Sequence, residues 1–233
     1  MHQIITELLF PRRCPICDDI VVPWGTLCCP GCQKRIGYLG NHYCMRCGKG
    51  LSGEENEYCH DCRKYPHKFV RGRSLYRYES VAGALFRFKY QGRQEYADFF
   101  GEELYRYLGR DIQTMGIEAV VPVPLHKSRL KERGYNQAGI LGKALAKRCG
   151  LAFREDMVIR HKKTVPQKQL SRKERQNNLK KAFKLTRNDV KLNTLLIVDD
   201  IYTTGSTVDA LAQVLLAGGA RQIYVVTLAT GME

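Results

Sequence analysis

The sequence has no long hydrophobic run. Its uninterrupted apolar stretches, such as Leu195–Val198 and Val214–Ala217, are several times shorter than the roughly 20 residues that a membrane-spanning helix needs. The first ten residues lack the basic segment with which a signal peptide begins. The triphosphate-binding pattern Gly-x-x-x-x-Gly-Lys-Ser/Thr is also missing. These absences argue against a membrane-spanning protein and a P-loop nucleotidase, and we expect a cytoplasmic protein without a transmembrane segment.

Acidic residues are the scarcer charged class. The chain of 233 residues has 23 Asp and Glu against 38 Lys and Arg, which gives a formal net charge of +15. Because 44% of its residues are hydrophobic, it can still bury a core, and a disordered basic tail is excluded. At roughly 150 residues per domain, the length indicates one domain and a smaller unit.

Cysteine is almost absent from the larger part of the chain. Nine of the ten cysteines lie between Cys14 and Cys62, and only Cys149 lies beyond them. Cysteine usage therefore marks a boundary near residue 68. We predict two units, residues 1–68 and residues 69–233.

The cysteines of the first unit form an internal repeat. Four Cys-x-x-Cys pairs occur, each beginning 15 residues after the one before. In a reduced compartment such pairs hold metal and do not form disulfides, and two pairs complete one tetrahedral zinc site. We therefore predict two structural zinc sites. The eight ligands are Cys14, Cys17, Cys29, Cys32, Cys44, Cys47, Cys59 and Cys62.

Sequence alone leaves open which pairs combine. We favour neighbouring pairs over interleaved ones, because each site then closes a compact loop by itself. Cys28 is adjacent to Cys29 and can substitute for it, whereas His60 and His67 are interpreted as bystanders. A unit of this size cannot build much of a core, so we expect metal binding to supply its folding free energy.

The residue after the second cysteine of a pair also affects a zinc turn. A small residue there lets backbone N–H groups reach the sulfur. Gly48, which follows Cys47, fits this requirement, and Asp18, which follows Cys17, fits it less well.

The excess positive charge belongs to the second unit. Residues 1–70 hold 9 basic and 7 acidic residues, and two loaded zinc sites would lower their charge to about −2. The rest of the chain holds 29 basic and 16 acidic residues. Its basic residues concentrate in Arg71–Arg93, His126–Arg148 and Arg160–Arg187, each with a single acid. A solvated helix face explains one such stretch, but three favour a polyanion: the phosphates of a small ligand, a nucleic acid, or both.

Short apolar segments alternate with helical patterns along the second unit. Ala119–Val123, Leu195–Val198 and Ile223–Leu228 have the composition of buried strands. Asn136–Arg148 and Thr207–Ala217 each place their apolar residues on one face, as amphipathic helices do. This alternation predicts an α/β fold, a parallel sheet flanked by helices, with ligands at the carboxyl ends of the strands.

The most specific segment follows one of these strands. Asp199 and Asp200 come directly after the apolar run, and the hydroxyl-rich turn Thr203–Thr207, with a single glycine, then opens a helix. Backbone N–H groups of such a turn and the positive end of the helix dipole can bind a phosphate. The two carboxylates would then face adjacent ribose hydroxyls, although paired acids also hold Mg²⁺ or cap a turn.

This strand, acid pair and Thr-Thr-Gly turn resemble the phosphoribosyl pyrophosphate (PRPP) fingerprint of the type I phosphoribosyltransferases. Over nearly its whole length the sequence is similar to the ComF family, of the ComFC type. The other motifs that carry the resemblance are Val121-Pro122-Val123-Pro124-Leu125 with Arg129, Arg133-Gly134-Tyr135-Asn136-Gln137, Gln169-Leu170-Ser171, Arg172, Arg175, Asn178 and Ala182-Phe183. The resemblance implies a type I phosphoribosyltransferase-like parallel sheet flanked by helices, with an N-terminal double zinc ribbon.

The resemblance also implies a PRPP site with three groups of residues. They are Asp199 and Asp200 for the ribose, Thr203, Thr204, Gly205, Ser206 and Thr207 for the 5′-phosphate, and His126, Lys127 and Arg129 for the pyrophosphate. Arg172 and Arg175 lie in a segment that resembles a flexible loop closing over the ligand, with Mg²⁺ bridging pyrophosphate and ribose oxygens. The Arg133–Gln137 run can equally begin the next helix.

Three functions are consistent with these observations. The family points to natural transformation, in which imported single-stranded DNA enters the cytoplasm beside a helicase partner, at the inner face of the membrane. This function, with a PRPP pocket, is our first hypothesis. The second is an active phosphoribosyltransferase acting on a base or a nucleic-acid end, although no segment is recognisable as a nucleobase hood. The third is a PRPP-sensing adaptor, in which closure over the ligand reshapes the contact with DNA or helicase.

Aromatic residues are interleaved with the first basic stretch. They are Tyr76, Tyr78, Phe86, Phe88 and Tyr90. Such residues suit base stacking along a backbone-tracking surface. Their alternate spacing suits the core side of a strand equally well.

Overall fold

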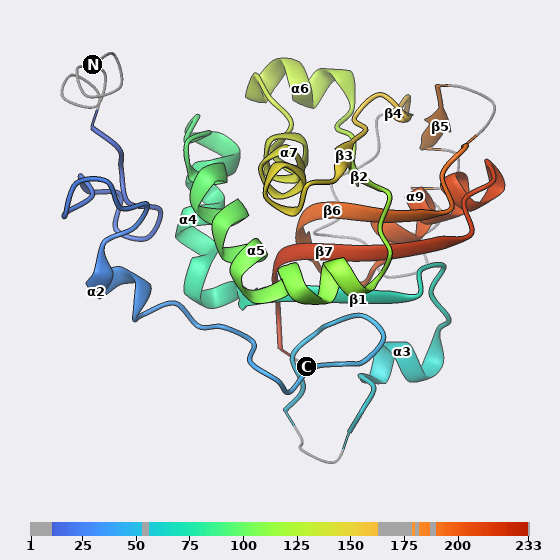
Figure 1. Ribbon diagram of the computed structural model, residues 1–233, viewed down its shortest axis with the longest axis horizontal. Coiled ribbons are helices and arrows are strands. Elements are labelled where there is room, and N and C mark those ends of the chain that lie inside the picture. The colour runs from blue at the N-terminus through green and yellow to red at the C-terminus, as the bar shows by residue number, and fades with distance from the viewer. Residues whose placement is uncertain (1–10, 53–55, 163–178, 180–181, 187–189, 233) are drawn as a thin grey trace.

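The computed structural model describes residues 11–52, 56–162, 179, 182–186 and 190–232. In chain order its elements are α2 (Pro30–Gln33), α3 (His60–Lys64), β1 (Arg71–Arg77), α4 (Tyr78–Tyr90), α5 (Tyr96–Thr114), β2 (Ala119–Pro122), α6 (Lys127–Arg133), α7 (Gln137–Cys149), β3 (Ala152–Phe153), β4 (Val158–Arg160), β5 (Phe183–Leu185), β6 (Thr194–Tyr202), α9 (Ser206–Ala217) and β7 (Gln222–Thr230) (Figure 1). None of the helices in this described part has the length and hydropathy needed to cross a membrane.

Five parallel strands form the central sheet, in the spatial order β1, β7, β6, β2, β3. The chain runs outward from β2 to β3, and in the opposite direction from β6 to β7. These connections diverge between the neighbouring strands β2 and β6, which makes that point the topological switch of the sheet. Ligands of open α/β sheets bind beside the carboxyl ends of the strands at such a point. The predicted parallel sheet is confirmed.

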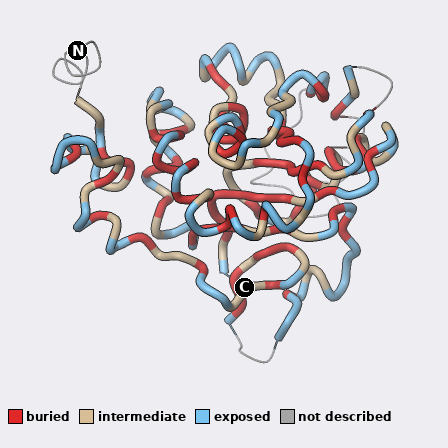
Figure 2. Tube along the Cα trace, in the orientation of Figure 1, coloured by how far each residue is buried: buried red, intermediate tan, exposed pale blue. Residues whose placement is uncertain are grey.

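The sheet is covered on both faces. Val120 and Leu196 pack with α5 and α7 on one face, whereas Val121 and Leu195 pack with α9 on the other. Side chains alternate along a strand, so a strand covered on both faces needs an unbroken apolar run. Leu195–Val198 is such a run, and Figure 2 shows the central strands buried.

The strand that carries the acid pair is longer than predicted. β6 continues past the apolar run to Tyr202, and Asp199 still pairs with Thr227 of β7. Asp199 and Asp200 therefore belong to the strand and do not follow it, because parallel pairing with β7 continues to Thr230. The two predicted helices are confirmed as α7 and α9, and α9 ends at Gly218 as a C-cap.

The first cysteine-rich segment packs against α4 and α5. Arg87 of α4 donates hydrogen bonds to the carbonyls of Pro15 and Ile16, at 2.9 and 2.8 Å. The hydroxyl of Tyr96 at the start of α5 donates to the carboxylate of Asp18 at 2.6 Å. These contacts place the first cysteine-rich segment, called the first ribbon below, at the side of the sheet where α4 lies (Figure 1).

The second cysteine-rich segment packs against the N-terminal end of β1. The backbone N–H of Gly72 donates to the carbonyl of Arg46 at 2.8 Å. Between the two segments, the chain runs along the outer edge of β1, where the N–H of Leu39 donates to the carbonyl of Leu75 at 3.0 Å. This pairing covers an edge strand that would otherwise present unpaired backbone groups.

Candidate functional site

The eight cysteines gather into two clusters of four. Cys14, Cys17, Cys29 and Cys32 form one, and Cys44, Cys47, Cys59 and Cys62 form the other, with the sulfur atoms of each cluster within 4.8 Å of one another. The Sγ atoms of Cys47 and Cys59 are 3.7 Å apart, close to the roughly 3.8 Å edge of a tetrahedron with Zn–S bonds of about 2.3 Å. The donor set therefore fits zinc, and the cysteines group as neighbouring pairs, the arrangement favoured from the sequence.

Cys28 lies beside the first cluster without replacing Cys29. Its Sγ is 3.6 Å from that of Cys14, and the residue is buried. The cluster itself takes Cys29. Cys28 thus packs as a small apolar side chain against Cys14 of the cluster.

Both clusters use the same left-handed turn after a second cysteine. Gly48 has φ +74° and Asp18 has φ +64°. A Cβ at Gly48 would lie 2.6 Å from the Cα of Arg73, so only glycine fits between the second cluster and β1. Asp18 has no such neighbour to avoid, and its carboxylate accepts hydrogen bonds from Tyr96 and Arg93 instead. The turns at Asp18 and Gly48 thus have similar backbone conformations. They differ in how closely β1 packs against the residue after the second cysteine.

The acid pair and the hydroxyl turn meet at the carboxyl end of β6. Gly205 has φ +77° and is the N-cap of α9. This position therefore favours glycine, which adopts the left-handed conformation without steric strain. The hydroxyls of Thr204 and Ser206 are 2.9 Å apart. Among the five residues of the turn, Thr207 lines the neighbouring pocket, whereas Thr203 is exposed.

A pocket of about 210 Å³ lies at the topological switch point. Its walls come from α4, the segment after β2, α6, α7, β4, β6 and the start of α9. The lining residues are Lys89, Tyr90, Val123, Leu125, Arg129, Arg133, Asn136, Gln137, Ala138, Arg160, Asp199, Asp200 and Thr207. Two carboxylates thus share one cavity with four basic side chains, the combination that a ligand with hydroxyls and phosphates needs.

The carboxyl of Asp199 has a raised pKa. Burial and the charge of Asp200 raise the pKa of Asp199 to about 7, while Lys89 and Arg160 oppose this rise. The Nζ of Lys89 is 2.9 Å from a carboxylate oxygen of Asp200. Arg160 is buried, and this burial lowers the pKa of its guanidinium. A carboxyl that titrates near neutral pH is a common feature of functional sites.

The predicted pyrophosphate residues do not all reach this pocket. Arg129 lines it. His126 is the N-cap of α6, where its Nδ1 accepts a hydrogen bond from the N–H of Ser128 at 3.2 Å. Lys127 is exposed at the start of α6. Arg172 and Arg175 lie outside the described residues.

The Arg133–Gln137 run has both structural and pocket-lining members. Tyr135 is buried and donates a hydrogen bond to the carbonyl of Phe88. Arg133 donates to the side-chain oxygen of Gln137 at 2.9 Å and to the hydroxyl of Tyr90 at 3.1 Å. Arg133, Asn136 and Gln137 line the pocket, and α7 begins at Gln137 with Asn136 as its N-cap, so the run both begins a helix and contributes pocket-lining residues.

The interleaved aromatic residues divide between a strand and a helix. Tyr76 lies on β1 and Phe88 on α4, and both are fully buried. The strand interpretation is wrong for Tyr78–Tyr90, which forms α4, because apolar positions there recur with helical period. Phe86 and Tyr90 are each 54% exposed, with ring centroids 5.2 Å apart.

Lys89 and Arg160 were not singled out from sequence, although each lies in a basic stretch. Their partners at β6 are far away along the chain, and nothing local in the sequence indicates such a contact.

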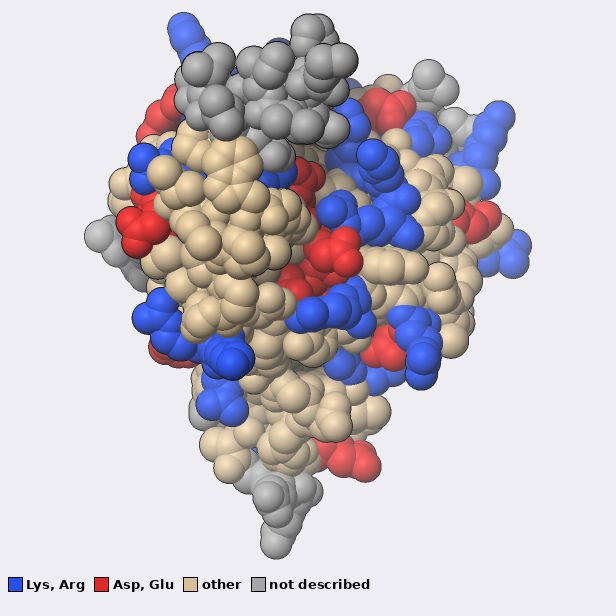
Figure 3. All heavy atoms as spheres, turned by 60° about the vertical axis from the view of Figure 1, so that its left-hand side comes forward, with Lys and Arg blue, Asp and Glu red and all other residues tan. Residues whose placement is uncertain are grey.

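Figure 3 shows one face of the molecule, on which acidic side chains gather near the centre with Lys and Arg beside them. Opposite charges are therefore interspersed on this face and do not form one basic field.

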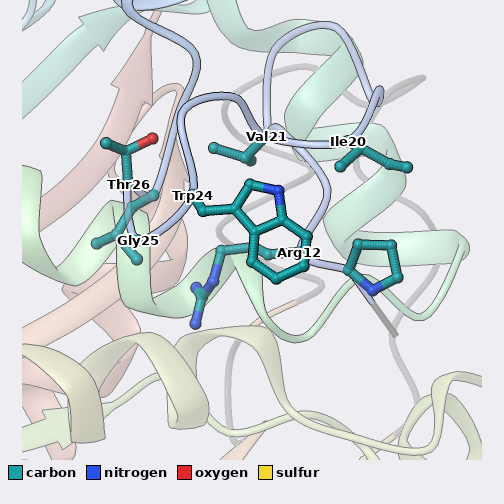
Figure 4. Close-up of a pocket in the computed structure, with 8 residues that line it drawn as sticks. Arg12, Ile20, Val21, Trp24, Gly25 and Thr26 are labelled. Carbon is teal, nitrogen blue, oxygen red and sulfur yellow. The ribbon is translucent and has the colours of Figure 1, made fainter. Parts of the chain in front are cut away.

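A second hollow lies on the first ribbon. It has a volume of about 80 Å³ and is lined by Arg12, Ile20 and Trp24 among others. Figure 4 shows the indole ring of Trp24 beside Arg12. Trp24 is 56% exposed, but Arg12 already pairs with Asp98 at 3.2 Å. The hollow is too small for a nucleotide.

Family comparisons match both parts of the chain. The family model of the double zinc ribbon domain matches residues 5–63, and that of the phosphoribosyl transferase domain matches residues 132–233. Over these two segments the chain is therefore similar to a double zinc ribbon domain and to a phosphoribosyl transferase domain. A hypoxanthine phosphoribosyltransferase from Staphylococcus aureus is 18% identical, covering 59% of this chain and 64% of its own, with a TM-score of 0.37.

Curated relatives of the chain are competence and DNA utilization proteins. Competence protein F of Haemophilus influenzae is 40% identical over 48% of this chain and 50% of its own length. DNA utilization protein YhgH of Escherichia coli K12 is 34% identical over 60% of this chain and 63% of its own. Competence protein ComFC of Bacillus subtilis is 30% identical over 63% and 58%. The matched segments thus span about half to three fifths of these relatives, and the resemblance to ComF-type proteins is confirmed.

Proposed function

We propose that this protein handles imported single-stranded DNA during natural transformation and binds PRPP at the carboxyl end of β6. The names of its relatives, competence protein and DNA utilization protein, support the first part. The match to a phosphoribosyltransferase domain supports the second. The family resemblance further carries the proposals of a helicase partner and of a cytoplasmic location at the inner face of the membrane.

One observation carries the PRPP proposal. Asp199 and Asp200 share a cavity with Arg129 and Arg160 at the topological switch point, and the N-terminus of α9 adjoins it. In this proposal the carboxylates accept hydrogen bonds from ribose hydroxyls, and the turn Thr203–Thr207 binds the 5′-phosphate.

The pyrophosphate of PRPP would face the basic wall of the same cavity. Arg129 and Arg160 are its members, and His126 and Lys127 lie at the adjoining start of α6. Carboxylate and phosphate oxygens are the ligands that Mg²⁺ prefers, so Asp199 and Asp200 fit a Mg²⁺ ion carried by PRPP. Arg172 and Arg175 stay predictions for the closing loop.

The DNA proposal rests on an exposed aromatic pair of α4, one member of which, Tyr90, lines this pocket. Phe86 and Tyr90 are exposed neighbours on α4, and the guanidinium of Arg133 lies 4.7 Å from the centre of the Tyr90 ring. Bases of a single strand stack on such rings, with a contribution of about 1–3 kcal/mol per base. A cation beside the ring would contact the backbone phosphates.

Titration with PRPP and a single-stranded oligonucleotide, separately and together, tests this function. We expect both ligands to bind, and DNA binding to weaken steeply as salt is added. Phe86→Ala is expected to weaken DNA binding about tenfold, since one stacking contact is lost, and to leave PRPP binding unchanged. Trp24→Ala, which removes an exposed aromatic ring of the first ribbon, is the matched control. An absence of DNA binding at low salt would contradict the proposal.

An active phosphoribosyltransferase is the second candidate function. Tyr90 and Arg133 reach the pocket that holds the acid pair, so α4 and α6 supply side chains where an acceptor could dock. Release of pyrophosphate from PRPP that depends on an added base or nucleic-acid end would support this candidate. The adaptor hypothesis instead requires PRPP and DNA to change each other's affinity by the same factor.

A further inference from the structure

His67 lies between the second zinc cluster and the turn Thr203–Thr207. The residue follows α3, and its side chain is completely buried. Its Nδ1 lies 2.7 Å from a carboxylate oxygen of Asp209. Because a carboxylate only accepts, Nδ1–H is the donor, and in the neutral ring Nε2 accepts from the hydroxyl of Tyr202 at 3.3 Å.

The two partners of His67 stand at the two ends of the turn. Tyr202 is the last residue of β6, and Asp209 lies in the first turn of α9. The backbone N–H of Lys68 donates to the second oxygen of Asp209 at 2.8 Å. The His67–Lys68 segment therefore ties the end of the strand to the start of the helix.

The turn itself rests on the His67 ring. A Cβ at Gly205 would lie 2.5 Å from the Tyr202 hydroxyl and 2.8 Å from Cε1 of His67. No larger residue fits at Gly205 while His67 and Tyr202 hold these positions. The shape of the turn thus depends on a residue that the zinc-binding segment contributes.

His67 and Tyr202 also lie against the segment that carries the second zinc cluster. Tyr202 is buried in the same cluster of packed side chains as Cys44, Cys47 and Cys59. Arg46, within the Cys44–Cys47 pair, donates to the carbonyl of His67 at 3.4 Å. A continuous set of contacts therefore leads from the cluster through Tyr202 and His67 to the turn.

We propose that His67 is a positioning residue that couples zinc at Cys44, Cys47, Cys59 and Cys62 to phosphate binding by the turn Thr203–Thr207. Zinc fixes the Cys59–Cys62 pair and with it α3, and α3 sets the position of His67. The coupling is reciprocal, because a phosphate ligand that favours the ordered turn also favours the loaded cluster. This inference rests on the proposed function of the turn.

The test uses the full chain with two zinc ions bound and PRPP with Mg²⁺ as the probe. Two quantities are measured: the dissociation constant of PRPP, and the rate at which a colorimetric chelator removes zinc with and without saturating PRPP. In the wild type we expect PRPP to slow the release of one of the two ions about tenfold. The other ion, held by Cys14, Cys17, Cys29 and Cys32, should leave at the same rate in both conditions.

His67→Ala is expected to keep both zinc ions, to raise the dissociation constant of PRPP about tenfold, and to abolish the protection of zinc by PRPP. His67→Asn, which keeps a donor toward Asp209, should restore part of both effects. His60→Ala, which removes an exposed histidine of α3, should behave as the wild type. If His67→Ala binds fewer than two zinc ions, Tyr202→Phe, which loses only the hydroxyl, carries the same expectations.

The possible failures are distinguishable. If the wild type binds PRPP and His67→Ala or Tyr202→Phe shows the same affinity and the same zinc protection, the coupling is wrong and the proposed PRPP site stands. If the wild type itself does not bind PRPP, the proposed function of the turn fails, and the coupling to PRPP fails with it.

Discussion

Lys89 of α4 contacts Asp200 of β6, with 2.9 Å between Nζ and a carboxylate oxygen. Both side chains are mostly buried, at 16% and 14% exposure, so solvent screens their interaction only weakly. The charge of Lys89 also lowers the pKa of the neighbouring Asp199 against the effects of burial and of Asp200. A lysine on α4, the helix that follows β1, thus opposes the rise in the pKa of Asp199.

Lys89→Met is predicted to raise the pKa of Asp199 above its value of about 7. The reason is that the variant removes the cation and leaves the charge of Asp200 uncompensated. Carboxyl carbon chemical shifts, followed by NMR as a function of pH, measure this pKa. Lys143→Met, which removes an exposed lysine of α7, is the control. An unchanged Asp199 titration in Lys89→Met would show that the contact has no electrostatic effect.

Asp199→Asn is predicted to flatten part of the pH dependence of stability. The pKa of Asp199 is about 7 in the folded protein and about 3.9 in the unfolded chain. Between these values the folded state binds more protons, so the contribution of this group to stability falls as pH rises from about 4 to 7.

The size of this effect is bounded by the pKa difference. About three pKa units at roughly 1.4 kcal/mol each give a loss of at most about 4 kcal/mol. Urea unfolding of the wild type and Asp199→Asn at pH 5 and pH 8 measures it. The wild type should lose more stability than the variant over this interval, and equal losses would show that the pKa of Asp199 is not raised.

Cys44→Ser is predicted to lower the zinc content from two ions to one per chain, because Cys44 belongs to the second cluster only. Metal binding supplies folding free energy to such small units, so the variant should also unfold at a lower temperature. Atomic absorption and thermal unfolding measure the two effects. Cys149→Ser, which changes a cysteine outside both clusters, should keep two ions. Retention of two ions by Cys44→Ser would contradict the ligand assignment.

Glu103→Ala is predicted to destabilise the fold by about 3 kcal/mol, since it leaves buried polar partners without an acceptor. Glu103 is 2% exposed and accepts hydrogen bonds from Gln33 of α2 and from Tyr38, which lies in the segment along the edge of β1. Glu102→Ala, which breaks an exposed ion pair with Arg148, should cost less than about 1 kcal/mol. Urea unfolding measures both losses, and similar losses would argue against Glu103 as the connection between ribbon and α5.

Local patterns in the sequence were sufficient to predict the two cysteine clusters and the position of the β6 motif. Cysteine spacing defines the clusters because each pair lies on one short turn, and Leu195–Val198 defines a strand because it is apolar on both faces. Lys89 and Arg160 could not be predicted, because their role comes from contacts with β6 across the fold. The alternate spacing around Phe88 was misleading, because it spans a strand and the helix after it.

Calorimetric titration of PRPP with Mg²⁺ into the wild type and into Asp199→Ala/Asp200→Ala tests the central claim most directly. Zinc content is measured on the same samples, because the acid pair and the cysteine clusters are separate sites. The account predicts saturable binding to the wild type, no detectable binding to the double variant, and two zinc ions per chain in both. Equal affinity of the two proteins for PRPP would contradict the assignment of the site.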